Sequence, residues 1–232
     1  MESKNLHKDH RQRARSRYRS EGLGSMADHN ILELLLFYGI PYKDTNPIAH
    51  ELIDRFGSLQ GVIDAPVEEL QKIKGVGENA ATLIKLVHDL AVLYGERTIV
   101  QDNSIPADEK ITNYLAMKYA GQTKEVVYML CVNSMGNILN CIKVCDGSPD
   151  SAILTTRMVV ETAVSFDSKD IIIAHNHPNG FAVPSMADVT ATQEFISILE
   201  SIGINLADHI IVSKDDQFSM AKSRKYSHLF KD

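Results

Sequence analysis

Apolar residues in the first part of the chain recur with the spacing of amphipathic helices. The longest such segment is Asn79–Tyr94, with apolar residues at Ala80, Leu83, Ile84, Val87, Leu90 and Ala91. Residues with this spacing lie on one face of an α-helix and can pack against a core. Shorter apolar segments precede it at Ile31–Tyr38, Pro47–Phe56 and Val67–Ile73. Gly57 follows the second of these as an expected helix C-cap. The pattern predicts an all-helical domain over residues 29–98.

Farther along the chain the period of the apolar residues changes. Short β-branched and apolar runs predict strands at Glu125–Val132, Asn137–Val144, Asp170–Ala174, Asn205–Val212 and Gln217–Met220. Helical patterns separate or precede them at Asp108–Ala120, Ala152–Ser165 and Ser185–Ile202. Alternation of strands and helices predicts an α/β or α+β domain over residues 108–232.

Two segments fall outside these domains. Residues from Gly95 to Pro106 are polar and turn-forming, and they indicate a linker, which we place at residues 99–107. Residues 1–28 form a basic N-terminal arm. Its first twenty residues hold seven lysines and arginines against two acidic residues, although the whole chain has a net charge of −6. Such an arm can contact phosphates, or it can be a solvated, partly disordered terminus.

Composition excludes several protein classes. Hydrophobic residues make up 44% of the 232 residues, which is typical of a globular protein. No apolar run approaches the roughly 18 residues of a membrane span, and the polar N-terminus is unlike a secretory signal. The three cysteines, an odd number without a CxxC pair, favour free thiols. We therefore expect a cytoplasmic protein with no membrane partner.

One short segment has the residues of a metal site. His175 and His177 end an Ile-rich strand, where residues i and i+2 project to the same face, about 6.6 Å apart. Pro178 ends the strand pairing, and Ser185 is an expected N-cap of the next helix. Asp188 then lies one turn into that helix and can fold back toward the histidines. Two imidazole nitrogens and one carboxylate oxygen are typical of a catalytic Zn²⁺, with the fourth position open for water.

Each part of this pattern also has a structural explanation. Ser185 and Asp188 form an ordinary capping pair, and the His-x-His sequence is common. The metal interpretation is stronger because the strand, the turn and the helix occur together in the required order.

The same residues resemble a known family. The string His-x-His-Pro, six residues, Ser185, two residues and Asp188 matches the signature of the JAB/MPN (JAMM) metallopeptidase-like superfamily. The fuller segments Ala174–Gly180 and Asp208–Ile211 resemble its RadC branch. Residues resembling the RadC N-terminal helical region are found at Ile40–Asp44, Arg55–Leu59 and Lys74–Gly77. The resemblance covers nearly the whole chain and implies a helical domain followed by a JAMM-like mixed-sheet α/β domain.

The resemblance also implies catalytic roles. In related enzymes the two histidines and the aspartate bind zinc, the serine helps to hold the oxyanion, and a glutamate from an early strand is the general base. Glu125 and Glu161 are the candidates for that glutamate, with Ser185 in the oxyanion role. Many relatives have Arg-Glu where this chain has Arg157-Met158, so we favour Glu125, which opens the first strand after a helix. Glu161 is expected to be a charge on a helix surface.

The helical domain contains a candidate nucleic-acid contact. Lys74, Gly75 and Gly77 lie between two predicted helices and resemble a helix-hairpin-helix turn, which presents backbone N–H groups to a phosphate. The alternative is a tight turn that only packs two helices together. Non-specific DNA binding through the N-terminal region is therefore a weaker expectation.

Three functions remain in contention. The first is zinc-dependent hydrolysis of a peptide or other amide substrate. The second is a DNA-binding or DNA-processing accessory role, as the repair-linked name of the family implies, with a structural or non-peptidase metal site. The third is a degenerate metal-binding module without turnover, against which the complete ligand set argues.

Overall fold

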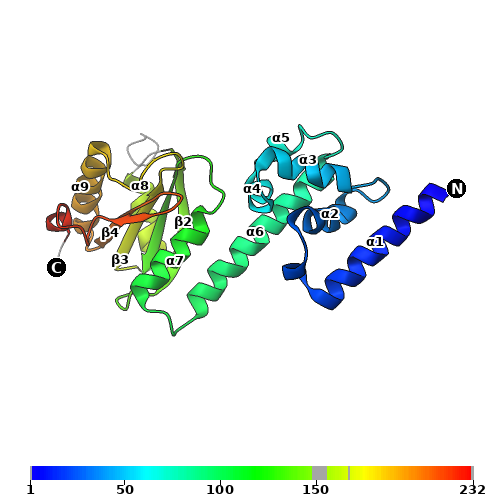
Figure 1. Cartoon of the computed structure of the whole chain (residues 1–232). Coiled ribbons are helices and arrows are strands. Elements are labelled where there is room, and N and C mark those ends of the chain that lie inside the picture. The colour runs from blue at the N-terminus through cyan, green and yellow to red at the C-terminus, as the bar shows by residue number, and fades with distance from the viewer. Residues whose placement is uncertain (1, 148–155, 167, 231–232) are drawn as a thin grey trace. The chain divides into compact units, whose positions relative to one another are not determined.

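A computed structural model describes residues 2–147, 156–166 and 168–230 (Figure 1). Contacts along the chain separate two compact units, Met1–Leu93 and Tyr94–Asp232. The first is a group of helices, and the second is a sheet covered by helices. The predicted fold class, an all-helical domain followed by a mixed-sheet α/β domain, is confirmed.

The first unit is built from helices around an apolar core. Its helical elements are α1 (Glu2–Glu21), the 3-10 helix η1 (Leu23–Ser25), α2 (Asp28–Gly39), α3 (Asn46–Phe56), α4 (Leu59–Asp64), α5 (Val67–Leu70) and the first part of α6 (Glu78–Gln101). The largest fully buried side chains of its core are Leu32, Leu36, Leu52, Leu70 and Ile84. Gly57, with φ of 82°, ends α3 as predicted. Ser58 then caps α4, which was not predicted because six residues are too few to show a helical period.

The N-terminal arm is a correction to the sequence analysis. Residues expected to form an arm are mostly the helix α1, which is attached to α2 by its own side chains. Arg11 donates hydrogen bonds to the carbonyl oxygens of Phe37, Ile40, Pro41 and Lys43, at 2.6–3.2 Å. These carbonyls lie at and beyond the end of α2, where backbone acceptors lack helical partners. His10 Nε2 also lies 2.9 Å from a carboxylate oxygen of the buried Glu33.

The linker is a second correction. Helix α6 continues through Gly95 to Gln101 and occupies part of the segment expected to be a linker. Gly95 does not end the helix. An added Cβ at this position would come within 2.4 Å of the terminal methyl group of Met117 on α7 (Ala107–Tyr119), so the Met117 side chain lies against Gly95. Glu96 then lies 3.2 Å from Lys118 on α7. Only residues 102–106 connect the helices.

The second unit is organised by a five-stranded mixed sheet. Its elements after α7 are β1 (Val126–Val132), β2 (Ile138–Asp146), α8 (Thr156–Ser165), β3 (Asp170–Asn176), α9 (Met186–Glu200), β4 (Asn205–Val212), β5 (Gln217–Ser219) and the 3-10 helix η2 (Ser227–Leu229). The strand order is β2-β1-β3-β4-β5. β3 and β4 are parallel, whereas the other neighbours are antiparallel. The start of the helix predicted at Ala152–Ser165 lies outside the described residues.

Helices cover both faces of this sheet. Leu130 of β1 and Ala174 of β3 pack with Leu115 of α7 on one face. Met129 of β1 and Ile173 of β3 share the opposite face with residues of α8 and α9. Because side chains alternate along a strand, His175 follows Ile173 onto the α9 face. Within the described residues, every helix is too short or too polar to span a lipid bilayer.

Candidate metal centre

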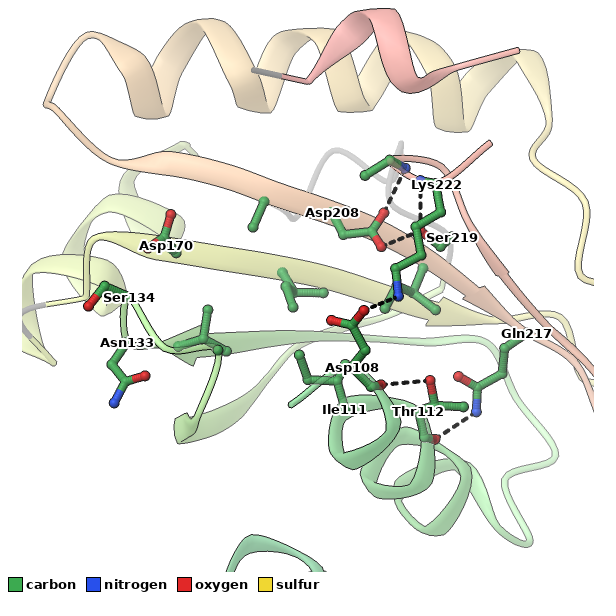
Figure 2. Close-up of a pocket in the computed structure, with 16 residues that line it drawn as sticks. Asp108, Ile111, Thr112, Asn133, Ser134, Asp170, Asp208, Gln217, Ser219 and Lys222 are labelled. Carbon is green, nitrogen blue, oxygen red and sulfur yellow. Dashed lines mark hydrogen bonds and ion pairs between the residues drawn. The ribbon is translucent and has the colours of Figure 1, made fainter. Parts of the chain in front are cut away.

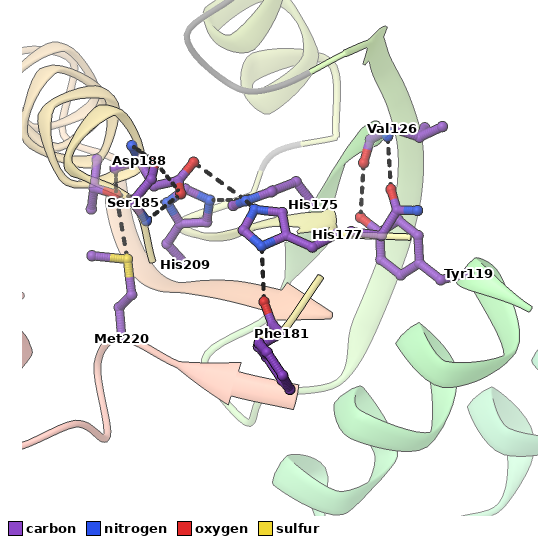
Figure 3. Close-up of polar contacts among 11 residues, drawn as sticks. Tyr119, Val126, His175, His177, Phe181, Ser185, Asp188, His209 and Met220 are labelled. Carbon is purple, nitrogen blue, oxygen red and sulfur yellow. Dashed lines mark hydrogen bonds and ion pairs between the residues drawn. The ribbon is translucent and has the colours of Figure 1, made fainter. Parts of the chain in front are cut away.

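The two histidines lie where β3 ends. His175 is paired with Val127 on β1 and with Ile211 on β4, so both neighbouring strands hold its backbone. The N–H of His177 donates to the carbonyl of Val212 at 2.8 Å. His175 is fully buried and His177 is half-buried. One candidate ligand is therefore inside the unit and the other is at its surface. Their Nε2 atoms lie 3.0 Å apart (Figure 3).

Asp188 uses its two carboxylate oxygens differently. Oδ2 accepts hydrogen bonds from the backbone N–H and the hydroxyl of Ser185, both at 2.7 Å. The hydroxyl oxygen of Ser185 in turn accepts from the N–H of Asp188 at 3.2 Å, which completes a capping box at the start of α9. Oδ1 lies 3.3 Å from Nε2 of His175. The capping interpretation and the metal interpretation are therefore compatible, because each uses a different oxygen.

The donor atoms of these three residues fit a small cation. The ligand atoms of His175, His177 and Asp188 all lie within 4.8 Å of one another. Nδ1 of His177 lies 3.0 Å from the carbonyl oxygen of Phe181, which can only accept, so the proton is on Nδ1 and Nε2 has a lone pair. Zn–ligand distances of about 2.1 Å in a tetrahedron require ligand atoms about 3.4 Å apart. The observed 3.0 and 3.3 Å separations are close to that value.

Glu125 is brought to the same place from a distant part of the chain. It precedes β1 and lines a pocket of ≈ 380 Å³ together with Thr123 and the loop from His177 to Gly180. Asn176, between the two histidines, fixes this arrangement. Its Oδ1 accepts from the N–H of Val126 at 2.7 Å, and its Nδ2 donates to the carbonyl of Lys124 at 3.0 Å. The residues on both sides of Glu125 are thus attached to β3, the strand of the candidate ligand His175.

Glu161, the other candidate base, is exposed on helix α8. This agrees with the expectation of a charge on a helix surface. It does not line the pocket that contains Glu125 and His177.

Two further residues lie behind His175. His209 of β4 is fully buried, and its Nε2 lies 2.9 Å from Nδ1 of His175 (Figure 3). Burial, followed by the neighbouring His175 and His177, lowers the pKa of His209 well below its ordinary value. Thr192 of α9 lies 2.6 Å from Nδ1 of His209. Thr192 was not predicted as a site residue, although its spacing of four residues from Asp188 puts both on one helix face.

Asp208, adjacent to His209, faces the other side of the sheet. It lines a second pocket of ≈ 500 Å³ with residues of α7, β3 and β5 (Figure 2). Its carboxylate accepts hydrogen bonds from Ser219 and from the N–H groups of His209 and Ala221. Burial raises the pKa of Asp208, while these hydrogen bonds oppose the rise. A structural role at the β4–β5 pair explains these contacts.

The candidate nucleic-acid residues lie in the first unit, whereas the candidate metal ligands lie in the second. Lys74 and Gly77 are exposed in the turn between α5 and α6. Gly75 has φ of 101°, and an added Cβ would approach Cδ1 of Ile48 to 2.8 Å, so glycine is required for the turn itself. Val76 is buried in the core. These contacts account for the turn as a packing element and leave its binding to DNA a prediction.

Comparisons with known proteins agree with this architecture. Residues 105–226 match the RadC-like JAB domain, and residues 5–82 match the UPF0758 N-terminal family. A UPF0758 protein of Fusobacterium nucleatum is 32% identical over 217 residues, which cover 90% of this chain and 94% of that protein. A UPF0758 protein of Ruegeria pomeroyi is 31% identical over 212 residues, which cover 91% of this chain and 95% of that protein. The chain thus belongs to the RadC (UPF0758) family and contains a RadC-like JAB domain.

Proposed function

We propose that the protein is a zinc-dependent hydrolase that cleaves a peptide or other amide bond. The observation that carries this proposal is the convergence of His175 Nε2, His177 Nε2 and Asp188 Oδ1 beside the pocket lined by Glu125. A bound zinc ion would polarise the substrate carbonyl and lower the pKa of water. The half-buried His177 leaves the site open to substrate.

Glu125 is the general base of this proposal. Its position in the pocket beside His177 is suited to accepting a proton from the attacking water, and then to returning that proton to the leaving amine. Ser185 is the group that supports the oxyanion. Its hydroxyl donates to Asp188 Oδ2, so it must rotate away from this oxygen to donate to substrate. The backbone N–H of Ser185 continues to hold Asp188 when the hydroxyl rotates.

The surroundings of the site favour a polymeric substrate. Phe181 and Val183, on the loop between β3 and α9, and Met186, the first residue of α9, are between 60% and 86% exposed. The carbonyl of Phe181 is hydrogen-bonded to His177, which ties this apolar loop to a metal ligand. Exposed apolar side chains beside a reactive centre are suited to contacting the side chains of a peptide.

Two measurements test the proposal. Elemental analysis after zinc reconstitution should find about one zinc per chain. Glu125→Gln should lower the rate of peptide hydrolysis by about 10²- to 10⁴-fold, because the proton acceptor is lost. Zinc content should remain, because Glu125 does not supply a ligand. Glu161→Gln is the matched control and should retain activity. Loss of activity in the Glu161 variant alone would show that the base is assigned wrongly.

A DNA-binding accessory role is the second candidate. It is favoured by the exposed turn of Lys74 and Gly77 at the start of α6, where helix N–H groups can meet a phosphate. In this case the metal centre would be structural or would act on another bond. A nuclease assay run in parallel with the peptidase assay separates the two candidates. Either activity should depend on zinc only if the metal centre is catalytic.

A further inference from the structure

A chain of buried side chains extends from His175 away from the other metal ligands. Nδ1 of His175 lies 2.9 Å from Nε2 of His209, and Nδ1 of His209 lies 2.6 Å from the hydroxyl of Thr192. That hydroxyl lies 2.6 Å from the main-chain carbonyl of Asp188. The three side chains of this chain, His175, His209 and Thr192, are fully buried. Each contact must therefore have a donor and an acceptor within the protein.

The carbonyl of Asp188 sets the direction of the whole chain. A carbonyl can only accept, and two oxygens 2.6 Å apart repel unless a proton lies between them. The single hydroxyl proton of Thr192 is thus donated to Asp188. The hydroxyl oxygen must then accept from His209, so the proton of His209 is on Nδ1 and its Nε2 is an acceptor.

The direction of these hydrogen bonds also determines which nitrogen of His175 carries a proton. Because Nε2 of His209 is an acceptor, Nδ1 of His175 must carry the proton that lies between the two rings. Nε2 of His175 then has a lone pair, and this atom faces Nε2 of His177 and Oδ1 of Asp188. In the reverse direction, Thr192 would donate to His209 and Nε2 of His175 would be protonated. That arrangement would leave the hydroxyl of Thr192 and the carbonyl of Asp188 in contact at 2.6 Å without a proton between them. It would also place a proton on the His175 nitrogen that faces the other two candidate ligands.

We propose that His209 and Thr192 are positioning residues that hold His175 in the tautomer able to bind a metal. This inference rests on the proposed metal site and adds to it the control of one ligand by β4 and α9. His177 is held in the same tautomer by a different partner, the carbonyl of Phe181. Asp188 takes part twice, through its carboxylate at the metal and through its main-chain carbonyl behind His175.

The first test compares zinc affinities of paired variants. Thr192→Val keeps the shape of the side chain and removes the hydroxyl, whereas Thr192→Ser keeps the hydroxyl. His209→Met removes both polar atoms, whereas His209→Gln keeps an acceptor and a donor. Loss of such partners of a metal-binding histidine weakens affinity by about 10- to 100-fold. We expect that loss in the Val and Met variants and affinity within about 3-fold of wild type in the Ser and Gln variants.

The second test reads the tautomer directly in the metal-free full chain. Nitrogen-15 NMR of labelled histidines, at a pH where imidazoles are neutral, should show His175 and His209 protonated at Nδ1. In Thr192→Val both residues should become mixtures of tautomers, while His177 stays unchanged. His175 protonated at Nε2 in the wild type would overturn the inference, and so would an unchanged spectrum in Thr192→Val. A chain that binds no zinc would refute the proposed function, while the tautomers would still decide this inference.

Discussion

The candidate metal centre and the basic N-terminal helix α1 are the two regions whose side chains the sequence most suggested as functional. The contacts of these side chains in the structure differ. At the centre, two side chains from the end of β3 and one from the start of α9 bring their donor atoms within 4.8 Å of one another. In α1, several cations are engaged within the first unit. Arg11 binds four carbonyls, Arg15 stacks over Tyr38, and Arg17 pairs with Glu21.

This difference shows what a residue pattern can establish. A spacing such as that of His175, His177 and Asp188 constrains geometry, because a strand end and a helix start fix where each side chain points. A count of charges constrains no geometry. Each arginine can bind carbonyls or carboxylates of its own unit, and it is then less available to a partner. The charge of residues 1–20 therefore overstates the surface that α1 can offer to DNA.

The largest effect is expected from a substitution that removes one of the proposed metal ligands. His177→Ala should weaken zinc binding by more than about 100-fold, because losing a ligand costs more than losing a partner of one. Competition with a chromophoric chelator measures this affinity. The helical unit has its own core, so the amide exchange of α2 and α3 should be unchanged. If zinc binds equally well without His177, the ion is held elsewhere.

A smaller effect is expected from substitution of Asn176, the residue of β3 that binds the neighbours of Glu125. Asn176→Ala removes both hydrogen bonds to the residues flanking Glu125. Misplacing a catalytic group by about 1 Å can lower activity by about 100-fold, so we expect kcat to fall by about 10- to 100-fold. The zinc content should persist. Asn179→Ala, at an exposed position of the same pocket, is the control and should change kcat little.

Substitutions in the basic helix α1 should change the stability of its attachment to the first unit. Arg11→Ala removes four hydrogen bonds from a charged group, which should destabilise the attachment of α1 by about 1–3 kcal/mol. Hydrogen exchange of the α1 amides measures this local opening. Arg13→Ala, at an exposed position of the same helix, should change the exchange by less than about 0.5 kcal/mol. Equal effects of the two substitutions would mean that the Arg11 contacts do not hold the helix.

Prediction from the sequence succeeded where local signals determine structure. The end of β3 at the histidines, the cap at Ser185 and the C-cap at Gly57 each depend on residues within a few positions. The predicted bounds of β4, Asn205–Val212, are those of the structure. The family and the fold class were also identified correctly, since the matching motifs are spread over nearly the whole chain.

Prediction was wrong where a tertiary contact decides. Gly95 was interpreted as part of a linker, but it lies inside α6, where the side chain of Met117 lies against it. The attachment of α1 depends on Arg11 reaching carbonyls about thirty residues away. Asn176 binds residues 124 and 126, which lie 52 and 50 positions earlier in the chain. None of these partners can be identified from spacing along the chain.

The smallest expected effect concerns DNA, and it tests whether any cation of the first unit is available to a partner. If the turn at Lys74 contacts a phosphate, the affinity of the full chain for duplex DNA should fall linearly with the logarithm of salt concentration. Lys74→Ala should then reduce the magnitude of that slope by about one. Lys222→Ala, whose side chain pairs with Asp108 in the second unit, is the control and should leave the slope unchanged. Fluorescence anisotropy of a labelled duplex over a salt series measures both slopes.

A slope unaffected by Lys74→Ala, or no binding even at low salt, would leave the turn with the packing role that Gly75 and the buried Val76 already give it. In that case the first unit would have no measured contact with nucleic acid, and the DNA-binding alternative would lose the observation that favours it.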